Sequence, residues 1–163
     1  MPVVNGCELP DELLYDVENQ LWYRDLGDGL VEVGITAVAA AMAGAVLAVT
    51  PKRAGRRLEA QQACAVVESG KVVGSARVAF AGQVERSNEP LMDRPSLVNQ
   101  DPYGAAWLVV MRPDDWIAAK AALIPGPAVA DPYRAKMEAE DFPGCSPQSP
   151  LSRAAGEGKG EGP

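Results

Sequence analysis

Apolar residues recur at every second position in several short stretches of the chain, which is the period of a β-strand with one buried face. Residues 21–26 and 30–35 form two such stretches around the turn Gly27-Asp28-Gly29, whose glycines permit a reversed backbone. Further strands are predicted at residues 45–49, 83–88 and 107–111. Many short strands with glycine-rich turns indicate a small β-sandwich or barrel.

The stretch ACAVVESGKVVGSARVAFAG at residues 63–82 predicts a β-hairpin. Its valines and its phenylalanine favour strands, no proline interrupts them, and Ser69-Gly70-Lys71-Val72 is a compact turn. Glycine at the first central position of a two-residue loop suits a type II′ turn, because that position needs φ > 0. Lys71 is then expected at the tip, where water and another protein can reach it.

Helix signals are fewer. A helix over residues 116–123 is predicted after Asp114 or Asp115, and another over residues 132–140 after Asp131, because aspartate is a common helix N-cap. From residue 142 onward glycine, proline, serine and charged residues dominate. Such a segment cannot bury enough surface to offset its ordering entropy, so we predict a disordered tail.

An uncharged run at residues 33–50 is about as long as a membrane span. Alanine and glycine dominate it, and no basic residues lead into it. Thr36 and Gly44 bracket an apolar segment in the positions that favour a helix N-cap and C-cap. We therefore expect a strand, a short helix over residues 36–43 and another strand, rather than a membrane span.

Composition excludes several classes of function. The 163-residue chain is long enough for one domain with tails, and its net charge of -7 disfavours a nucleic-acid partner, which requires a basic surface. The chain contains no histidine, which removes His-dependent triads, most transition-metal sites and the usual general base near neutral pH. We expect neither a catalytic residue nor a metal site.

Three separated motifs, in order, resemble those of one family, the H-protein of the glycine cleavage system, which is a lipoyl carrier. The matching stretches are VEVGITAVAAAMAG at residues 31–44, AVVESGK at residues 65–71 and LVNQDPYGAAWL at residues 97–108. The resemblance covers about residues 21–116. It implies a mainly β fold, a lipoyl-domain-like barrel-sandwich hybrid of two small antiparallel sheets, with short peripheral helices and a C-terminal helical extension.

Boundaries follow from this resemblance and from the composition. We expect an N-terminal arm over residues 1–12, the H-protein-like lipoyl domain over residues 13–125, a C-terminal helical extension over residues 126–141 and the tail over residues 142–163.

The resemblance also implies lipoic acid joined by an amide bond to Lys71. Glu68 and Gly82 match positions that lipoate-attaching enzymes recognise in this family. From the residues alone, Glu68 is equally a solvated side chain beside the turn, and Gly82 is equally a turn glycine. Gly70 stands where the family usually has valine, and we expect it to loosen the hairpin tip. The protein would present the cofactor, and the cofactor would supply the thiol–disulfide chemistry.

Other departures bear on the function. Ala79 replaces a usual proline, and an early histidine of the family is absent, with Asn19 or Gln20 nearby. Retained lipoyl motifs with altered flanks are similar to the H-protein-like lipoate-binding subgroup of the heterodisulfide-reductase-like sulfur-oxidising system. We expect a carrier of sulfur intermediates. The alternatives are an aminomethyl carrier of glycine cleavage and a non-lipoylated scaffold or regulatory domain.

The expected partners are lipoate-attaching enzymes and either the heterodisulfide-reductase-like complex or the glycine cleavage enzymes, with dihydrolipoamide dehydrogenase as a further candidate. We expect a monomer.

The three cysteines are scattered without a C-x-x-C pair, so the spacing signals neither a zinc site nor a disulfide framework, and a reducing cytoplasm fits best. Cys64 lies in a predicted strand and is expected to be a small buried hydrophobe. Cys7 and Cys145 lie towards the termini. They are either incidental or candidate redox thiols that approach the lipoyl arm or each other.

Overall fold

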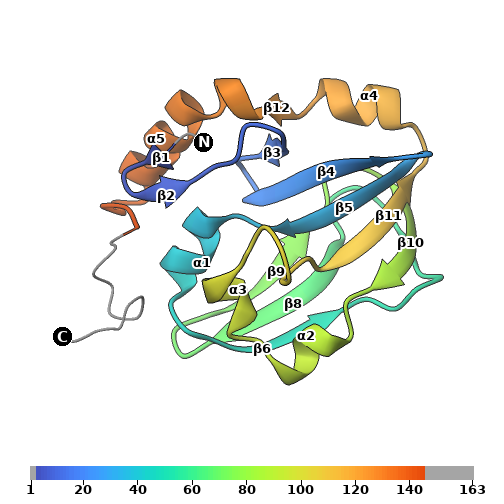
Figure 1. Ribbon diagram of the computed structural model, residues 1–163, viewed down its shortest axis with the longest axis horizontal. Coiled ribbons are helices and arrows are strands. Elements are labelled where there is room, and N and C mark those ends of the chain that lie inside the picture. The colour runs from blue at the N-terminus through green and yellow to red at the C-terminus, as the bar shows by residue number, and fades with distance from the viewer. Residues whose placement is uncertain (1–2, 146–163) are drawn as a thin grey trace.

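The computed structural model describes residues 3–145 as a stack of two β-sheets with short helices at the periphery (Figure 1). The large sheet is antiparallel, with the spatial order β12 (Ile124–Pro125), β3 (Leu14–Asp16), β4 (Leu21–Gly27), β5 (Leu30–Ile35), β11 (Val109–Pro113), β10 (Gly82–Ser87) and β7 (Arg57–Leu58). The small sheet has the order β6 (Val46–Pro51), β8 (Ala63–Ser69) and β9 (Val73–Arg77). A separate ribbon pairs β1 (Val3–Val4) with β2 (Cys7–Glu8).

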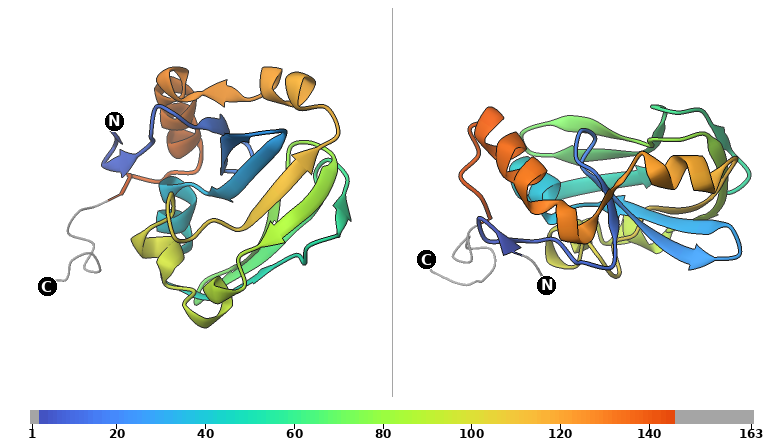
Figure 2. Two further views of the ribbon diagram at one scale, coloured as in Figure 1. Left: turned by 45° about the vertical axis from the view of Figure 1, so that its right-hand side comes forward. Right: turned by 90° about the horizontal axis from the view of Figure 1, so that it is seen from above.

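Five α-helices and one 3₁₀-helix connect or cover the strands in the described part of the chain. They are α1 (Ala37–Ala43), α2 (Pro90–Asp93), α3 (Leu97–Gln100), α4 (Trp116–Ala121), the 3₁₀-helix η1 (Gly126–Ala128) and α5 (Ala130–Ala139). Figure 2 shows α5 beside the β1–β2 ribbon, at the opposite end of the molecule from α4. None of the helices between residues 3 and 145 has the length and apolar character needed to cross a bilayer.

The main core lies between the two sheets. Tyr23, Val31 and Val33 of the large sheet meet Val49 and Ala65 of the small sheet, and all five side chains are buried. Alternation along β5 explains this arrangement, because every second residue points to the same face of a strand. The predicted two-sheet, mainly β fold is therefore confirmed. The described strands do not close into a barrel. Two small sheets were predicted, whereas the larger of the two has seven strands.

A second hydrophobic cluster lies under the terminal segments. Val4 and Leu9 of the N-terminal segment pack with Tyr133 and Met137 of α5 around the buried Trp22. Half-buried Phe142 packs against the same cluster. The predicted disordered tail from residue 142 is therefore wrong for residues 142–145, and its remainder lies outside the described residues.

Most of the predicted helices and strands are present, but their first and last residues differ from the prediction. The strand, helix and strand expected within residues 33–50 are present as β5, α1 and β6. The strand predicted at residues 107–111 is β11, two residues later. The α5 helix begins at Ala130, two residues before the predicted start, and Asp131 lies in its first turn rather than at its cap. Asp115 caps α4 by accepting from the Ala118 N–H, as predicted.

Candidate functional site

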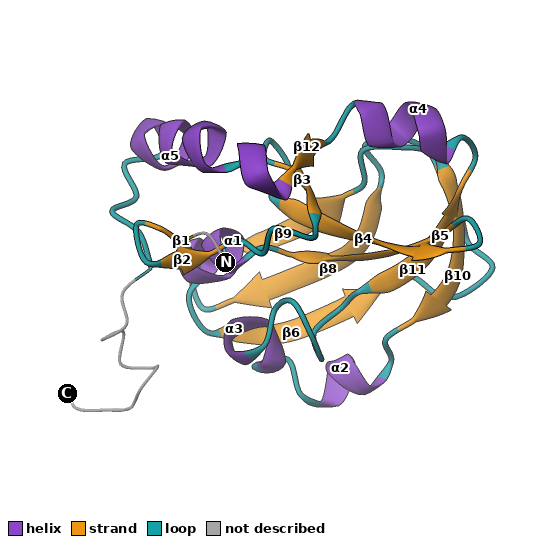
Figure 3. Cartoon of the chain, turned by 45° about the horizontal axis from the view of Figure 1, so that its top comes forward, coloured by secondary structure: helices purple, strands orange, loops and turns teal. Residues whose placement is uncertain are grey.

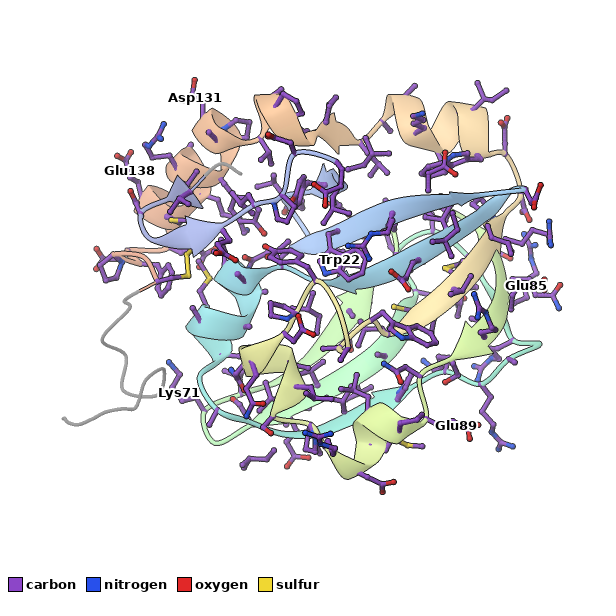
Figure 4. The ribbon with its side chains drawn as sticks, viewed as in Figure 1. Trp22, Lys71, Glu85, Glu89, Asp131 and Glu138 are labelled. Carbon is purple, nitrogen blue, oxygen red and sulfur yellow. A yellow bond between two sulfur atoms is a disulfide. The ribbon has the colours of Figure 1, made fainter. Side chains whose placement is uncertain are left out.

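A two-residue loop places Lys71 at the tip of the β8–β9 hairpin, as predicted. Glu68 pairs with Val73 in the strand register, and the Ser69 N–H donates to the Val72 carbonyl at 2.9 Å, so Gly70 and Lys71 form the loop. The Lys71 side chain is exposed and projects from the end of the small sheet (Figure 4).

The predicted type II′ turn is wrong, because Gly70 does not have a positive φ. The Ser69 hydroxyl closes the turn instead: its Oγ accepts hydrogen bonds from the N–H groups of Lys71 and Val72, each at 3.2 Å. Serine side chains commonly form such local bonds to backbone in turns. A Cβ atom added at Gly70 would meet no heavy atom within 4 Å, so this glycine is not required by space or by backbone conformation.

Three exposed aliphatic side chains lie near the lysine, two directly after it in the chain and one on β6, which pairs with β8. The exposed fraction is 70% for Val73, 51% for Val72 and 61% for Leu47, which is high for large apolar side chains. Glu68 is exposed next to them. Lys71 therefore stands at the edge of an apolar surface that carries one carboxylate.

A cavity of about 200 Å³ opens beside the hairpin tip. Val72 belongs to its lining, and the Lys71 Cε lies 3.7 Å from the position that a Cβ on Gly44 would occupy, at the end of α1. The polar side chains of the lining are Asn19, Gln20 and Ser75. All its other side chains are aliphatic, and no charged residue of the described chain lines it. Lys71 is thus placed next to a neutral, largely apolar cavity.

The wall of this cavity is held by the first and third sequence motifs. Thr36 caps α1 by accepting from the Ala39 N–H at 3.2 Å. At the other end of α1, Asn99 donates to the Gly44 carbonyl at 2.8 Å and accepts from the Val46 N–H at 2.9 Å. The motif at residues 97–108 therefore supports the helix that lines the cavity. Sequence analysis identified the motif but not this contact, which joins residues more than fifty positions apart.

Two tyrosines that the sequence analysis did not single out also hold α1. The Tyr133 hydroxyl lies 2.7 Å from Thr36 Oγ1, and the Ala37 N–H donates to the Tyr103 hydroxyl at 2.9 Å. Burial raises the pKa of both tyrosines above the ordinary value, so both phenols are neutral near pH 7. A polar aromatic residue close to a helix N-cap leaves no periodic signal in the sequence, which is why these contacts were missed.

Gly82, the second predicted recognition residue, is the buried first residue of β10 and not part of a turn. A Cβ atom there would lie 2.6 Å from the Arg112 carbonyl oxygen and 2.9 Å from Pro113 Cα. Close approach of the neighbouring strand therefore requires glycine at this position. Glu68 and Lys71 lie together at the hairpin, whereas Gly82 lies in the other sheet.

The three cysteines fall into two environments. Cys64 is buried in β8, as predicted, and burial raises the pKa of its thiol to about 12. Cys7 and Cys145 form a disulfide, which corrects the expectation that the spacing signals none. The partners are 138 residues apart, so only the fold brings them together. Within residues 3–145, no cluster of three or more cysteine, aspartate or glutamate side chains is arranged to hold a metal ion.

The fold and the hairpin lysine define a class of protein, a small two-sheet β domain that presents one lysine on a tight hairpin. The sequence profile of the family described as Glycine cleavage H-protein matches residues 13–133. The chain belongs to this family.

Individual relatives agree with the family assignment. Glycine cleavage system H protein 5 of Aquifex aeolicus is 41% identical, over 76% of this chain and 86% of the relative. H proteins 2 and 3 of the same organism are 35% and 37% identical, over 83% and 66% of this chain and 84% and 67% of their own. The crystal structure of a glycine cleavage system H protein from Mycobacterium marinum superimposes with a TM-score of 0.66 at 29% identity, covering 79% of this chain and 98% of that one.

Proposed function

We propose that this protein is a lipoyl carrier whose lipoyl group is attached to Lys71. The observation that carries the proposal is the exposed Lys71 at the tip of a two-residue hairpin loop, within AVVESGK, in a member of the H-protein family. The residues fit such a group, because space around the tip is open and an apolar cavity adjoins it. When attached, the lipoyl group supplies a dithiolane that interconverts with a dithiol.

The residues around Lys71 would present the lipoyl group to partner enzymes. The backbone bond between Ser69 and Val72 and the two bonds to Ser69 Oγ hold the loop, so the lysine stem begins from a defined point. We propose that Glu68 is read by the lipoate-attaching enzyme, because it is exposed three residues before the lysine. The apolar surface of Leu47, Val72 and Val73 suits contact with partner enzymes, since exposed aliphatic groups gain most from burial at an interface.

The lining of the cavity bears on what is carried. An aminomethyl group contains an amine, which is protonated near neutral pH, and transfer of a charged amine into a neutral cavity is costly without a carboxylate partner. The described lining has only Asn19, Gln20 and Ser75 as polar side chains. A sulfur-bound group that carries no charge enters such a cavity at lower cost. We therefore propose sulfur intermediates of a heterodisulfide-reductase-like system as the cargo.

An aminomethyl cargo is the second candidate, and the names of the relatives favour it. Aquifex aeolicus has H proteins numbered 2, 3 and 5, so one organism can hold several members of this family. In either case the partners are lipoate-attaching enzymes and the enzymes of the multienzyme system, with dihydrolipoamide dehydrogenase as a further candidate. We place the carrier in the cytoplasm.

Intact-mass measurement tests the attachment site. The chain produced in cells competent for lipoylation is expected to gain the mass of one lipoyl group, and Lys71→Arg is expected to lose it completely. Lys120→Arg is the matched control, because Lys120 is also exposed but lies on α4. A lipoyl mass on Lys71→Arg would move the attachment to another lysine, and none on the native chain would favour the non-lipoylated scaffold instead.

Recognition by the attaching enzyme is tested with Glu68→Gln. We expect slower lipoylation of this variant and an unchanged rate for Glu59→Gln, whose carboxylate pairs with Arg57 away from the hairpin. Equal rates for the two variants would remove Glu68 from recognition without affecting Lys71 as the attachment site.

The cargo is tested with purified lipoylated protein, glycine decarboxylase and labelled glycine. A sulfur carrier is expected to remain unlabelled, whereas its reduced form is expected to gain the mass of one sulfur atom from thiosulfate, whose sulfane sulfur passes to a thiol of the arm as sulfite leaves. Transfer of the glycine label to the lipoyl group would assign the protein to glycine cleavage.

A further inference from the structure

The two ends of the described chain cross at the Cys7–Cys145 disulfide. The Cys145 N–H donates to the Asn5 carbonyl at 2.9 Å, and the Asn5 side-chain amide lies 3.4 Å from the Met137 sulfur. Gly6 and Gly144 both have positive φ, and a Cβ at either one would collide with the opposite segment. We call residues 3–9 together with residues 130–145 the terminal cover. Its two halves meet backbone to backbone, and the disulfide locks them.

The terminal cover lies over the N-terminal end of α1 (Figure 3). Tyr133 of α5 contacts Thr36 Oγ1 at 2.7 Å, so the N-cap of α1 is held from the C-terminal half of the cover. The Tyr103 hydroxyl donates to the Glu8 carbonyl while it accepts from the Ala37 N–H, which links the N-terminal half to the same helix. Both halves therefore hold α1 in place.

The same contacts extend to the cavity beside Lys71. The Tyr133 hydroxyl lies 3.3 Å from Gln20 Oε1, and the Gln20 amide lies 3.5 Å from the Met42 sulfur of α1. Gln20 and the α1 residues Ala39, Ala40 and Ala43 line the cavity. Figure 4 shows the disulfide and Lys71 at the same end of the molecule. Breaking the disulfide can therefore alter the cavity wall, because Tyr133 contacts both Gln20 and the N-cap of α1.

We propose that the Cys7–Cys145 disulfide is a second redox site of this protein: it accepts two electrons from a dithiol of the dihydrolipoyl class, and its reduction releases the terminal cover from α1. Cytosolic disulfides are commonly exchangeable rather than permanent, because the compartment is reducing. A lipoyl carrier also works by dithiol–disulfide exchange, so a reductant of the right class belongs to its own chemistry. The choice of the reductant and the link to the Lys71 arm rest on the proposed lipoylation, whereas release of the terminal cover on reduction does not.

The step balances as a two-electron exchange. One thiolate of the dithiol attacks Cys145 Sγ, forming a mixed disulfide as the Cys7–Cys145 bond breaks, and Cys7 leaves as a thiolate and takes a proton. The second thiol of the reductant then closes its own disulfide and expels the Cys145 thiolate, which also takes a proton. Two cysteine thiols and one cyclic disulfide are formed.

Burial decides the order of attack. Cys145 is half-buried at the surface, whereas Cys7 is 1% exposed in the second hydrophobic cluster. An external thiolate therefore reaches Cys145 first. The leaving Cys7 sulfur stays in an apolar environment that disfavours a thiolate, so exchange is expected to be fast only when residues 141–145 lift from Asn5.

The first experiment uses the full-length Lys71→Arg chain, which cannot carry the proposed arm, with free dihydrolipoamide as the probe. Reduction is followed by alkylation of thiols and intact mass. We expect the oxidised chain to gain two alkyl groups as the ratio of dihydrolipoamide to lipoamide rises, and Cys7→Ser and Cys145→Ser each to gain only one under the same conditions, from the thiol whose partner is missing. Buried Cys64 is the internal control, since it is free and buried in every state. A disulfide that persists in excess dihydrolipoamide on a folded chain would make it a purely structural bond and overturn the proposal.

The second experiment compares oxidised and reduced native chain by hydrogen exchange, with circular dichroism as the check that both remain folded. Reduction is expected to speed amide exchange in α1 and in residues 3–9 by about tenfold or more, because local opening controls exchange. Strands β4 and β5 should be unchanged. Equal protection of α1 in the two states would contradict release of the cover. The link to the arm is tested separately with NADH and dihydrolipoamide dehydrogenase, which reduce the lipoyl group: the Cys7–Cys145 bond is expected to be reduced in the lipoylated chain and to persist in Lys71→Arg, which has no arm to pass on the electrons.

Discussion

Gly70 and Gly82 differ in whether the folded structure requires glycine at their position. Gly70 has open space around its α-carbon and no positive φ, so a side chain there would cost little in the folded state. Gly82 has the backbone of β11 within 3 Å of a would-be Cβ, so a side chain there would push two paired strands apart. A requirement for glycine is therefore structural at residue 82, whereas at residue 70 it must come from mobility or from a partner.

Stability measurements separate these two glycines. Gly82→Ala is expected to lower the free energy of unfolding by about 1–3 kcal/mol, the usual cost of overpacking a tight contact. Gly70→Ala should change it by less than about 0.5 kcal/mol, as for most surface substitutions. Urea unfolding followed by circular dichroism measures both. A Gly82→Ala protein as stable as Gly70→Ala would show that β11 moves aside without cost.

At the scale of elements, α1 lines the cavity and also contacts the third sequence motif and the terminal cover. It is only seven residues long and carries neither an acidic residue in its first turn nor a basic one in its last. Isolated helices of this length are unstable in water. Its stability therefore comes from burial of Val38 and Ala40 in the two hydrophobic clusters, together with Thr36, Asn99, Tyr103 and Tyr133, which bind its two ends.

Replacing the cap of α1 tests this dependence. Thr36→Val keeps the side-chain shape but removes the oxygen, so the cap bond is lost and the buried Tyr133 hydroxyl loses a partner. We expect a loss of about 1–3 kcal/mol, the sum of an N-cap and one hydrogen bond of a hydroxyl that keeps Gln20 Oε1 as its other partner.

Asp115→Ala is the matched control, because it removes a cap of the same kind from the exposed helix α4. It should cost only about 0.5–2 kcal/mol. Equal losses in the two variants would mean that Gln20 Oε1 satisfies the Tyr133 hydroxyl fully when Thr36 Oγ1 is absent.

At the scale of the whole molecule, two hydrophobic clusters stabilise the fold. The first lies between the sheets, and the second joins the termini to α1 and Trp22. All four tyrosines of the chain contribute to one or other cluster or to its hydrogen bonds, and burial raises the pKa of each. Ionisation of a buried phenol is therefore coupled to unfolding.

This coupling gives a pH prediction with a defined sign. Because the folded-state pKa of each tyrosine lies above the unfolded value of about 10, their stabilisation is complete below that pH and is lost as the pH rises above it. Phenolate absorbance is expected to appear only together with the loss of circular dichroism. In urea, all four tyrosines should titrate near pH 10. A tyrosine that ionises near pH 10 in protein with native circular dichroism would contradict the described burial.

Local patterns were sufficient for the longer strands, for α1 with its Thr36 cap and for Lys71 at a hairpin tip, because each depends on residues within a few positions of one another. They did not predict the strands of two or three residues, β1, β2, β3, β7 and β12, which form only against distant partners. The turn type at Gly70 was not, because the Ser69 hydroxyl competes with the backbone for the same N–H groups. Element ends such as those of β11 and α5 also shifted, since packing against distant neighbours decides where hydrogen bonding stops.

The motif at residues 65–71 by itself therefore predicted an exposed lysine at a hairpin tip and, with two other motifs, the family. Only the tertiary structure decided what surrounds that lysine: a neutral cavity, a wall held by Asn99 and Tyr133, and a disulfide between cysteines 138 residues apart. The physical reason is separation along the chain. Contacts between residues far apart leave no periodic signal, and they exist only because two sheets and two termini bury apolar surface together.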